Sequence, residues 1–173
     1  MKYEITKLKH SIHKGLFRIK ALKDYRNVKQ GEFGGYVQSY DNLSQDGDCW
    51  IFNDACVFEN AQVYGDAKIL GNAKVYGNAQ VYKGARVFGN ARIYGKAKIF
   101  GYAEIHGYAR VYENAKVYGA SWIDMDAEIC GDSKIELNRQ YFCHKITKGQ
   151  VTKENFKVFL KVEKWFPYFT ETK

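Results

Sequence analysis

Aliphatic residues recur every six positions over about half of this chain. From Ile51 to Ile135 each sixth residue is Ile or Val, and the residue two places before each is Ala, Ser or, before Ile51, Cys49. The repeating unit A-x-V-x alternates as a β-strand does, so the small and the aliphatic residue share one face and the other two residues share the opposite face. We therefore expect a series of short strands, each with one buried face.

Two residues separate each strand from the next, usually Gly-Asn or Gly-Asp. Where one of the two departs from this pattern, the other is still Gly, Asn or Asp. Such residues tolerate positive φ, so every corner keeps one residue suited to a left-handed backbone. Corners that all turn the same way wind a coil whose successive turns pair in parallel. The pattern predicts an all-β solenoid and not a set of hairpins.

This repeat resembles that of the hexapeptide-repeat family, whose usual motif is [LIV]-G-x-x-[STA]-x. The resemblance covers about residues 43–136, although here an aromatic residue follows the aliphatic one and glycine comes one place later. It implies a single-stranded left-handed parallel β-helix of triangular section, with three hexads per coil. The left-handed sense comes from the resemblance alone, because general rules for parallel connections favour right-handed crossovers.

A narrower resemblance concerns origin. The segment GGYVQSYDNLSQDGDCWI (residues 34–51) and the following GNAxVYGNA runs resemble β-helix proteins common in phage and prophage genomes. This resemblance implies a viral or mobile-element source and no activity.

The repeat is flanked by two segments without the hexad. We expect an N-terminal cap with short strands over residues 1–36, including a strand in LFRIKAL (16–22), the β-helix over 37–136, and a basic C-terminal cap over 137–173. A cap hides the open edge of the coil, which would otherwise invite polymerisation. In the C-terminal cap, Thr152 as N-cap and Pro167 as stop favour a short helix, whereas residues 153–165 also alternate tolerably as a strand.

Charge and composition narrow the class of protein. The net charge is +8, yet residues 51–136 hold ten basic and ten acidic residues, while residues 137–173 hold eight and three. The chain contains neither an apolar stretch long enough to span a membrane nor the apolar core of a signal peptide, so we expect a cytoplasmic protein. The four cysteines form no CxxC pair, so we expect reduced thiols, no metal site and no cofactor.

Eighteen residues per coil sort the outward residues into three faces, with neighbouring coils about 4.8 Å apart. Stacked aromatic rings should then lie beside columns of Lys and Arg. The first face carries Cys56, Phe58, Lys74, Tyr76, Arg92, Tyr94, Arg110, Tyr112, Glu128 and Cys130. The second face carries Gln62, Tyr64, Gln80, Tyr82, Lys98, Phe100, Lys116, Tyr118, Lys134 and Glu136. The third face carries Trp50, Phe52, Lys68, Leu70, Arg86, Phe88, Glu104, His106, Trp122 and Asp124.

An exposed aromatic stripe with interleaved basic residues is typical of a binding surface, although in-register rings also stabilise a coil without any partner. We expect a non-catalytic protein that binds a protein partner, with self-association as a dimer or trimer included. The phage-like resemblance extends this expectation to a host defence factor that the solenoid inhibits by occlusion. The residues expected to bind are Lys74, Tyr76, Arg92, Tyr94, Arg110 and Tyr112.

Two alternatives remain open. Interleaved Tyr and Arg can stack on bases while Lys meets phosphates, which would make a nucleic-acid-binding solenoid, although the coil is neutral and carries no recognised motif. The second alternative is a hexapeptide-type acyltransferase. Those enzymes typically use a histidine and a loop that leaves the coil, and no loop interrupts the hexads here.

His106 is the only histidine of the repeat, and we expect it one coil from Asp124 with Phe88 on its other side. Such a pair could act as a general base, but no Ser or Cys nucleophile obviously joins it. The carbonic-anhydrase relatives of the fold use three histidine ligands, whereas His10, His13 and His144 lie in the caps.

Overall fold

The computed structural model describes residues 1–142 and 145–152, and within them the chain is built almost entirely of short strands. The N-terminal cap contains β1 (Tyr3–Lys9), β2 (Phe17–Ala21), β3 (Phe33–Val37) and the 3₁₀ helix η1 (Tyr40–Asn42). The solenoid strands are β4 (Trp50–Ile51), β5 (Cys56–Val57), β6 (Gln62–Val63), β7 (Lys68–Ile69), β8 (Lys74–Val75), β9 (Gln80–Val81), β10 (Arg86–Val87), β11 (Arg92–Ile93), β12 (Lys98–Ile99), β13 (Glu104–Ile105), β14 (Arg110–Val111), β15 (Lys116–Ile123), β16 (Glu128–Ile129), β17 (Lys134–Phe142), β18 (Lys145–Ile146) and β19 (Gln150–Thr152).

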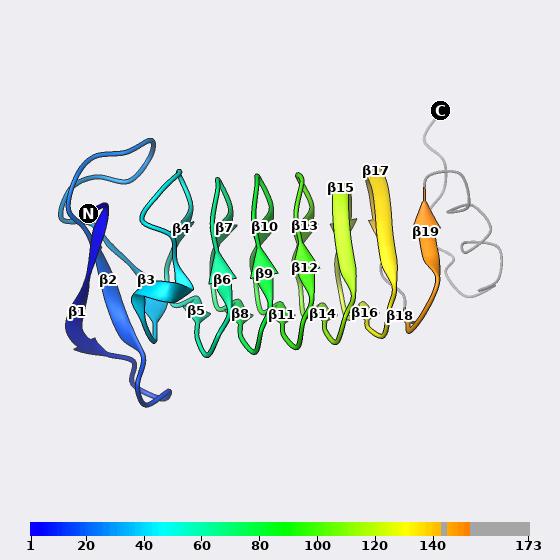
Figure 1. Cartoon of the computed structure of the whole chain (residues 1–173), viewed down its shortest axis with the longest axis horizontal. Helices are drawn as coiled ribbons and strands as arrows, with labels where there is room; N and C mark the ends of the chain where they lie inside the picture. The colour runs from blue at the N-terminus through cyan, green and yellow to red at the C-terminus, as the bar shows by residue number, and fades with distance from the viewer. Residues whose placement is uncertain (143–144, 153–173) are drawn as a thin grey trace.

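Strands of successive turns pair in parallel. Arg86 of β10 lies opposite Glu104 of β13, 18 residues further along (104 − 86), and the same offset joins β7 to β10 and β8 to β11. The result is a stack of about six turns (Figure 1). The predicted all-β parallel solenoid is thereby confirmed, while its left-handed sense and its hexapeptide-repeat membership stay predictions.

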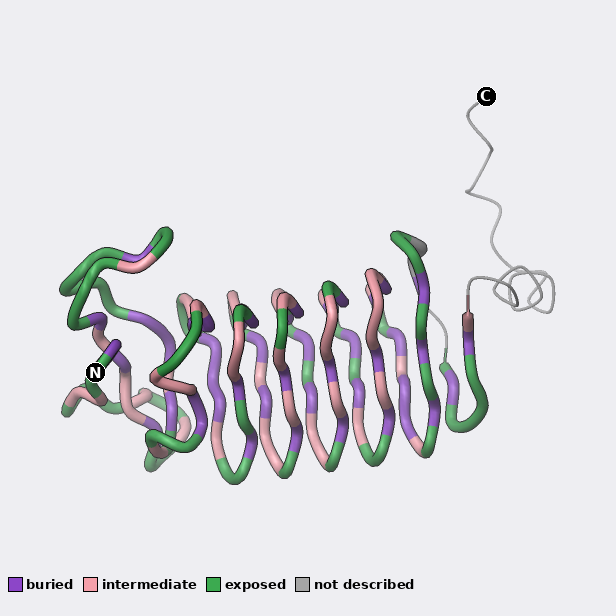
Figure 2. Tube along the Cα trace, turned by 45° about the horizontal axis from the view of Figure 1, so that its top comes forward, coloured by how far each residue is buried: buried purple, intermediate pink, exposed green. Residues whose placement is uncertain are grey.

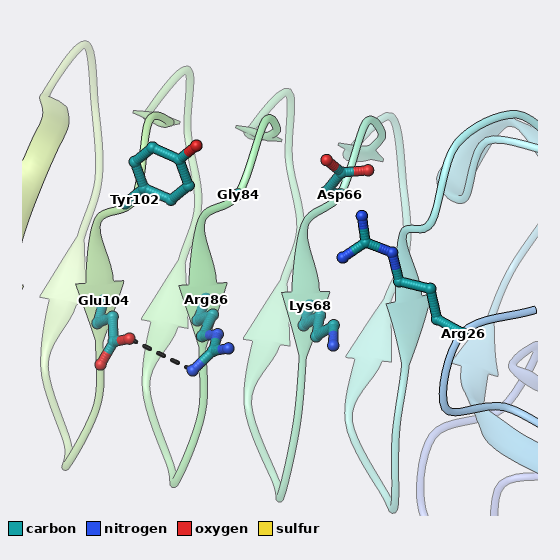
Figure 3. A pocket seen from close by; sticks show the side chains of 7 residues that line it. All are labelled: Arg26, Asp66, Lys68, Gly84, Arg86, Tyr102 and Glu104. Carbon is teal, nitrogen blue, oxygen red and sulfur yellow. Dashed lines mark ion pairs between the residues drawn. The ribbon is translucent and has the colours of Figure 1, made fainter.

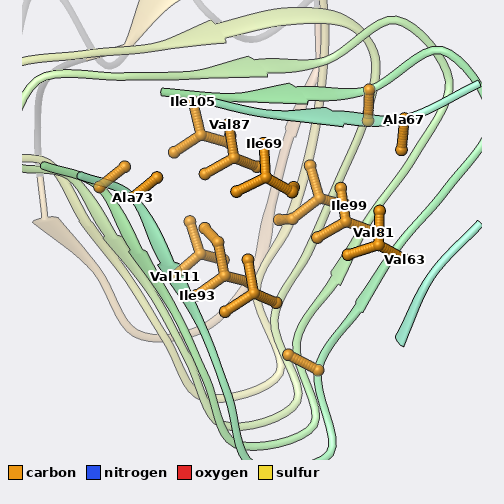
Figure 4. Close-up of a cluster of buried hydrophobic side chains, with 14 of the residues drawn as sticks. Val63, Ala67, Ile69, Ala73, Val81, Val87, Ile93, Ile99, Ile105 and Val111 are labelled. Atoms are coloured by element: carbon orange, nitrogen blue, oxygen red, sulfur yellow. The ribbon is translucent and has the colours of Figure 1, made fainter. Parts of the chain in front are cut away.

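The interior of the stack is filled by the aliphatic residues of the repeat. Val87, Ile93 and Ile99 are each 0% exposed, and Figure 4 shows the three columns to which they belong converging on a shared core. Burial alternates along the coil, with the ring-bearing positions partly exposed (Figure 2). Each buried aliphatic side chain contributes about 1.5–3 kcal/mol before chain entropy is counted. The predicted inward aliphatic and outward aromatic positions are confirmed.

The corners depart from the expected chemistry. Positive φ falls on the first corner residue even where that residue is Glu59 (φ 56°) or Lys83 (φ 58°), and not on the following Asn60 or Gly84. A left-handed conformation costs a non-glycine residue about 1–2 kcal/mol. At Glu59 a compensating contact exists, because its Oε2 accepts the N–H of Gly77 one coil later at 2.7 Å. Hydrogen bonds to charged groups contribute about 1.5–3 kcal/mol, so this acidic corner residue stabilises the stack.

The N-terminal cap changes the direction of pairing. β1 pairs with β2 and β2 with β3 in antiparallel fashion, and β3 then pairs in parallel with β5 of the first coil. The strand predicted in residues 16–22 is therefore confirmed as β2. β1 forms the outer edge of this sheet, so the parallel edge of the first coil is covered by the cap.

Buried polar contacts fasten the cap to the first coil. The side chain of Lys2, which is 3% exposed, donates to the carbonyls of Gly47 (3.2 Å) and Cys49 (3.0 Å) and contacts the Cys49 sulfur at 3.3 Å. All three ammonium protons thus have an acceptor. Trp50, which we assigned to the outward third face, is fully buried because the cap residues Tyr3 and Tyr25 pack edge-on against its ring.

The solenoid continues beyond the predicted boundary at residue 136. β18 pairs in parallel with β16 and β19 with β17, so the ladder reaches Thr152. The offset between paired residues falls to 17 (145 − 128) and 16 (150 − 134). A strict six-residue pattern cannot detect these shorter coils. The helix predicted after Thr152 lies outside the described residues.

Candidate functional site

The first face carries a column of stacked rings. Phe58, Tyr76, Tyr94 and Tyr112 follow one another at centroid distances of 5.1, 5.0 and 4.9 Å, with ring planes within 6° of parallel. Tyr76 and Tyr94 therefore have a neighbour on both ring faces and offer only ring edges and hydroxyl groups outward. Burial raises the pKa of both tyrosines, so their hydroxyls stay protonated and can donate hydrogen bonds.

A row of cations lies beside this column. Lys74, Arg92 and Arg110 are opposite one another in register. Like charges in directly opposite positions destabilise a sheet. One carboxylate meets the row at its end: Glu128 lies 3.5 Å from Arg110 and 2.6 Å from Lys145. Within residues 1–142 and 145–152, no carboxylate forms an ion pair with Arg92.

The N-terminal end of the first face is covered by the cap. The His13 ring stacks on Phe58 at 6.3 Å, and its Nε2 lies 2.8 Å from the Lys74 Nζ. Sequence reasoning gave His13 no role, because the contact joins residues 61 positions apart and no periodicity relates the cap to the coil. The six residues that we expected to bind thus share one face, and His13 extends it.

The second face has the same plan with a different cation. Tyr64, Tyr82, Phe100 and Tyr118 stack at 4.9 to 5.1 Å, and three lysines lie opposite one another beside them: Lys98, Lys116 and Lys134. The two faces therefore differ mainly in presenting arginine or lysine.

The third face holds the expected His–Asp pair. His106 Nδ1 lies 2.8 Å from Asp124 Oδ1, and the His106 ring stacks on Phe88 at 4.8 Å. Asp124 thus orients the imidazole as a base would require. The thiol of Cys56 offers no nucleophile at neutral pH, since burial raises its pKa to about 11. The pair by itself stabilises the stack as well as any chemistry.

A groove of about 370 Å³ lies between the third face and the cap (Figure 3). Its charges compensate one another, because Arg86 lies 3.5 Å from Glu104 and Arg26 pairs with Asp48. Its lining residues are Arg26, Asp66, Lys68, Gly84, Arg86, Tyr102 and Glu104. The balance of charge leaves this groove without a preference for anions or cations.

In the part of the chain that the structure describes, no three His, Cys, Asp or Glu side chains gather as metal ligands would. No helix among the described residues is long and apolar enough to cross a membrane. Compared with models of known protein families and with curated protein sequences, the chain matches none of them. The argument for function therefore comes from the faces themselves.

Proposed function

We propose that the protein is a non-catalytic solenoid whose first face docks on an acidic surface of a protein partner. The observation that carries this proposal is the in-register row of Lys74, Arg92 and Arg110 beside stacked ring edges. Three like charges in one row cost folding free energy. An acidic partner removes that cost by supplying the carboxylates that the row lacks.

The first face is favoured over the second because of its arginines. Arginine and tyrosine are enriched at protein interfaces, whereas lysine is depleted. A guanidinium also binds a carboxylate with two parallel hydrogen bonds, which an ammonium cannot do. The lysine row of the second face is better explained as a solvated surface.

The stacked geometry argues against the nucleic-acid alternative. Binding of single strands depends on bases stacking on exposed aromatic faces. Both faces of Tyr76 and Tyr94 are already covered by neighbouring rings, so a base has no platform there. We expect no binding of single- or double-stranded oligonucleotides in low salt.

The resemblance to phage and prophage proteins supports a partner from the host, including a defence factor that the solenoid would inhibit by covering its active surface. A second copy of this chain is the other protein partner that we consider, as a dimer or trimer. Both belong to the proposal through the same face.

The test is a pair of double variants. Arg92→Glu with Arg110→Glu should abolish capture of the partner from the native host, while the matched second-face pair Lys98→Glu with Lys116→Glu should retain it. Circular dichroism should show the same fold in both, and light scattering should report whether self-association is lost with the arginines. Capture that survives the arginine reversal, or that fails equally in both pairs, would rule out the first face.

A further inference from the structure

A second site lies where the cap meets the first face. The turn between β1 and β2 folds over the coil and encloses a cavity of about 330 Å³. The His10 ring shapes this turn, because its Nδ1 accepts the N–H groups of Ile12 (3.0 Å) and His13 (3.1 Å). The cavity is lined by His10, Ser11, Ile12, His13, Tyr36, Asp54, Asn72 and Lys74.

Three groups that can carry positive charge converge on this cavity. Lys74 Nζ lies 2.8 Å from His13 Nε2, and the rings of His13 and His10 are 4.8 Å apart. An ammonium group only donates hydrogen bonds, so the His13 Nε2 that it contacts is unprotonated and the ring is neutral. Burial lowers the pKa of His13, as do the charges of Lys74 and His10. A second proton on this ring would face Lys74 directly.

The other charged and titratable groups leave the cavity electropositive. Asp54 supplies the carboxylate of the lining, and Arg92 follows Lys74 in the cation row. On the cap side, the Arg18 guanidinium lies 5.3 Å from the Tyr36 ring. The Cys56 thiol beneath Lys74 is neutral, because burial raises its pKa to about 11. Fixed cations therefore outnumber the one carboxylate even while both imidazoles are neutral.

We propose that this cavity binds a small oxyanion, a phosphate or a carboxylate, between Lys74 and the imidazoles of the cap turn. The oxyanion would accept hydrogen bonds from Lys74 Nζ and from His13 once its Nε2 is protonated. It would separate two cations that otherwise repel each other. Binding then strengthens as the pH falls through the titration of His13, since the protonated ring adds both a charge and a donor.

The anion has two possible sources. Free phosphate would occupy the cavity of the isolated protein, whereas a carboxylate would come from an acidic side chain of a partner docked on the adjoining first face. The site does not depend on the docking proposal, because small anions can be added without any partner. Loss of partner capture would leave this inference standing.

The experiment follows the histidine ring protons by NMR across a pH titration, at constant ionic strength, in chloride, in acetate or in inorganic phosphate. His13 is assigned with a His13→Asn variant, and His106 serves as an internal reference on another face. We expect the His13 pKa to rise by about one unit on replacing chloride, equivalent to about tenfold tighter anion binding by the protonated ring. The pKa of His106 should stay the same in all three salts.

Two matched variants decide the role of the ammonium. Lys74→Met should abolish the anion-dependent rise at His13, whereas Lys98→Met, which removes a lysine at the equivalent strand position of the second face, should preserve it. A greater rise in phosphate than in acetate identifies free phosphate as the ligand, and an equal or greater rise in acetate identifies a carboxylate. Identical His13 titrations in the three salts would overturn the proposal, as would a rise that persists in Lys74→Met.

Discussion

Replacing Gly95 by alanine tests whether contact between neighbouring coils determines which residue can occupy a corner. Gly95 has φ +67°, and a Cβ there would lie 2.7 Å from the backbone nitrogen and 3.0 Å from the Cα of Glu113. The left-handed conformation costs alanine about 1–2 kcal/mol, and crowding against fixed backbone adds about 1–3 kcal/mol. We therefore expect a loss of about 2–5 kcal/mol, a large share of the 5–15 kcal/mol typical of a folded domain.

The matched control is Lys83→Ala. Lys83 has φ 58° and already carries a Cβ, so this variant should lose only the contact of its ammonium group with the Phe100 ring, 5.7 Å away, or about 0.5–1 kcal/mol. Unfolding in urea, followed by circular dichroism, measures both losses. Amide exchange shows whether coils beside residue 95 open first, as expected when each repeat contacts only its neighbours. Equal losses in the two variants would refute the role assigned to inter-coil contact.

Three further outcomes follow from the cap and the coil. Lys2→Met leaves acceptors near Cys49 unpaired and should destabilise the protein by about 1–3 kcal/mol in urea unfolding; an unchanged midpoint would contradict the fastening role. Lys145 lowers the pKa of Glu128, so the pair stabilises the fold above the ordinary carboxyl pKa and the effect is lost as pH falls through the lowered one; in Lys145→Met, carboxyl NMR should show the Glu128 pKa rising. Cys56, whose pKa moves from 9.0 to about 11, should hold about a hundredfold less thiolate at pH 8 than an ordinary thiol, and iodoacetamide should label it far more slowly in the native than in the urea-unfolded protein.

The coil was predictable because each turn repeats one environment. An aliphatic residue at every sixth position is enough to set which side chains point inward, and the offset of 18 residues then places Arg92 opposite Arg110. The same logic placed His106 beside Asp124. Periodicity therefore predicted the candidate face residue by residue.

Contacts that join the cap to the coil left no such signal. Lys2 meets Cys49 across 47 positions and His13 meets Lys74 across 61, and neither pair belongs to a repeat. The corner residues escaped prediction for another reason. Propensity alone favours Gly or Asn at positive φ, whereas Glu113 is held there by accepting the Gly131 N–H at 2.6 Å, a bond that exists only after the coils have stacked.

The constant offset between paired residues restricts how a gene for such a protein can change in length. Duplication of a segment encoding 18 residues, the spacing that joins Arg92 to Arg110, would add one more cation-and-ring rung and leave all downstream surfaces aligned. Duplication of a six-residue segment would rotate everything after it onto a neighbouring side and split the arginine row between two surfaces. Evolution can therefore lengthen this recognition surface only in whole turns, each of which offers a partner one additional contact.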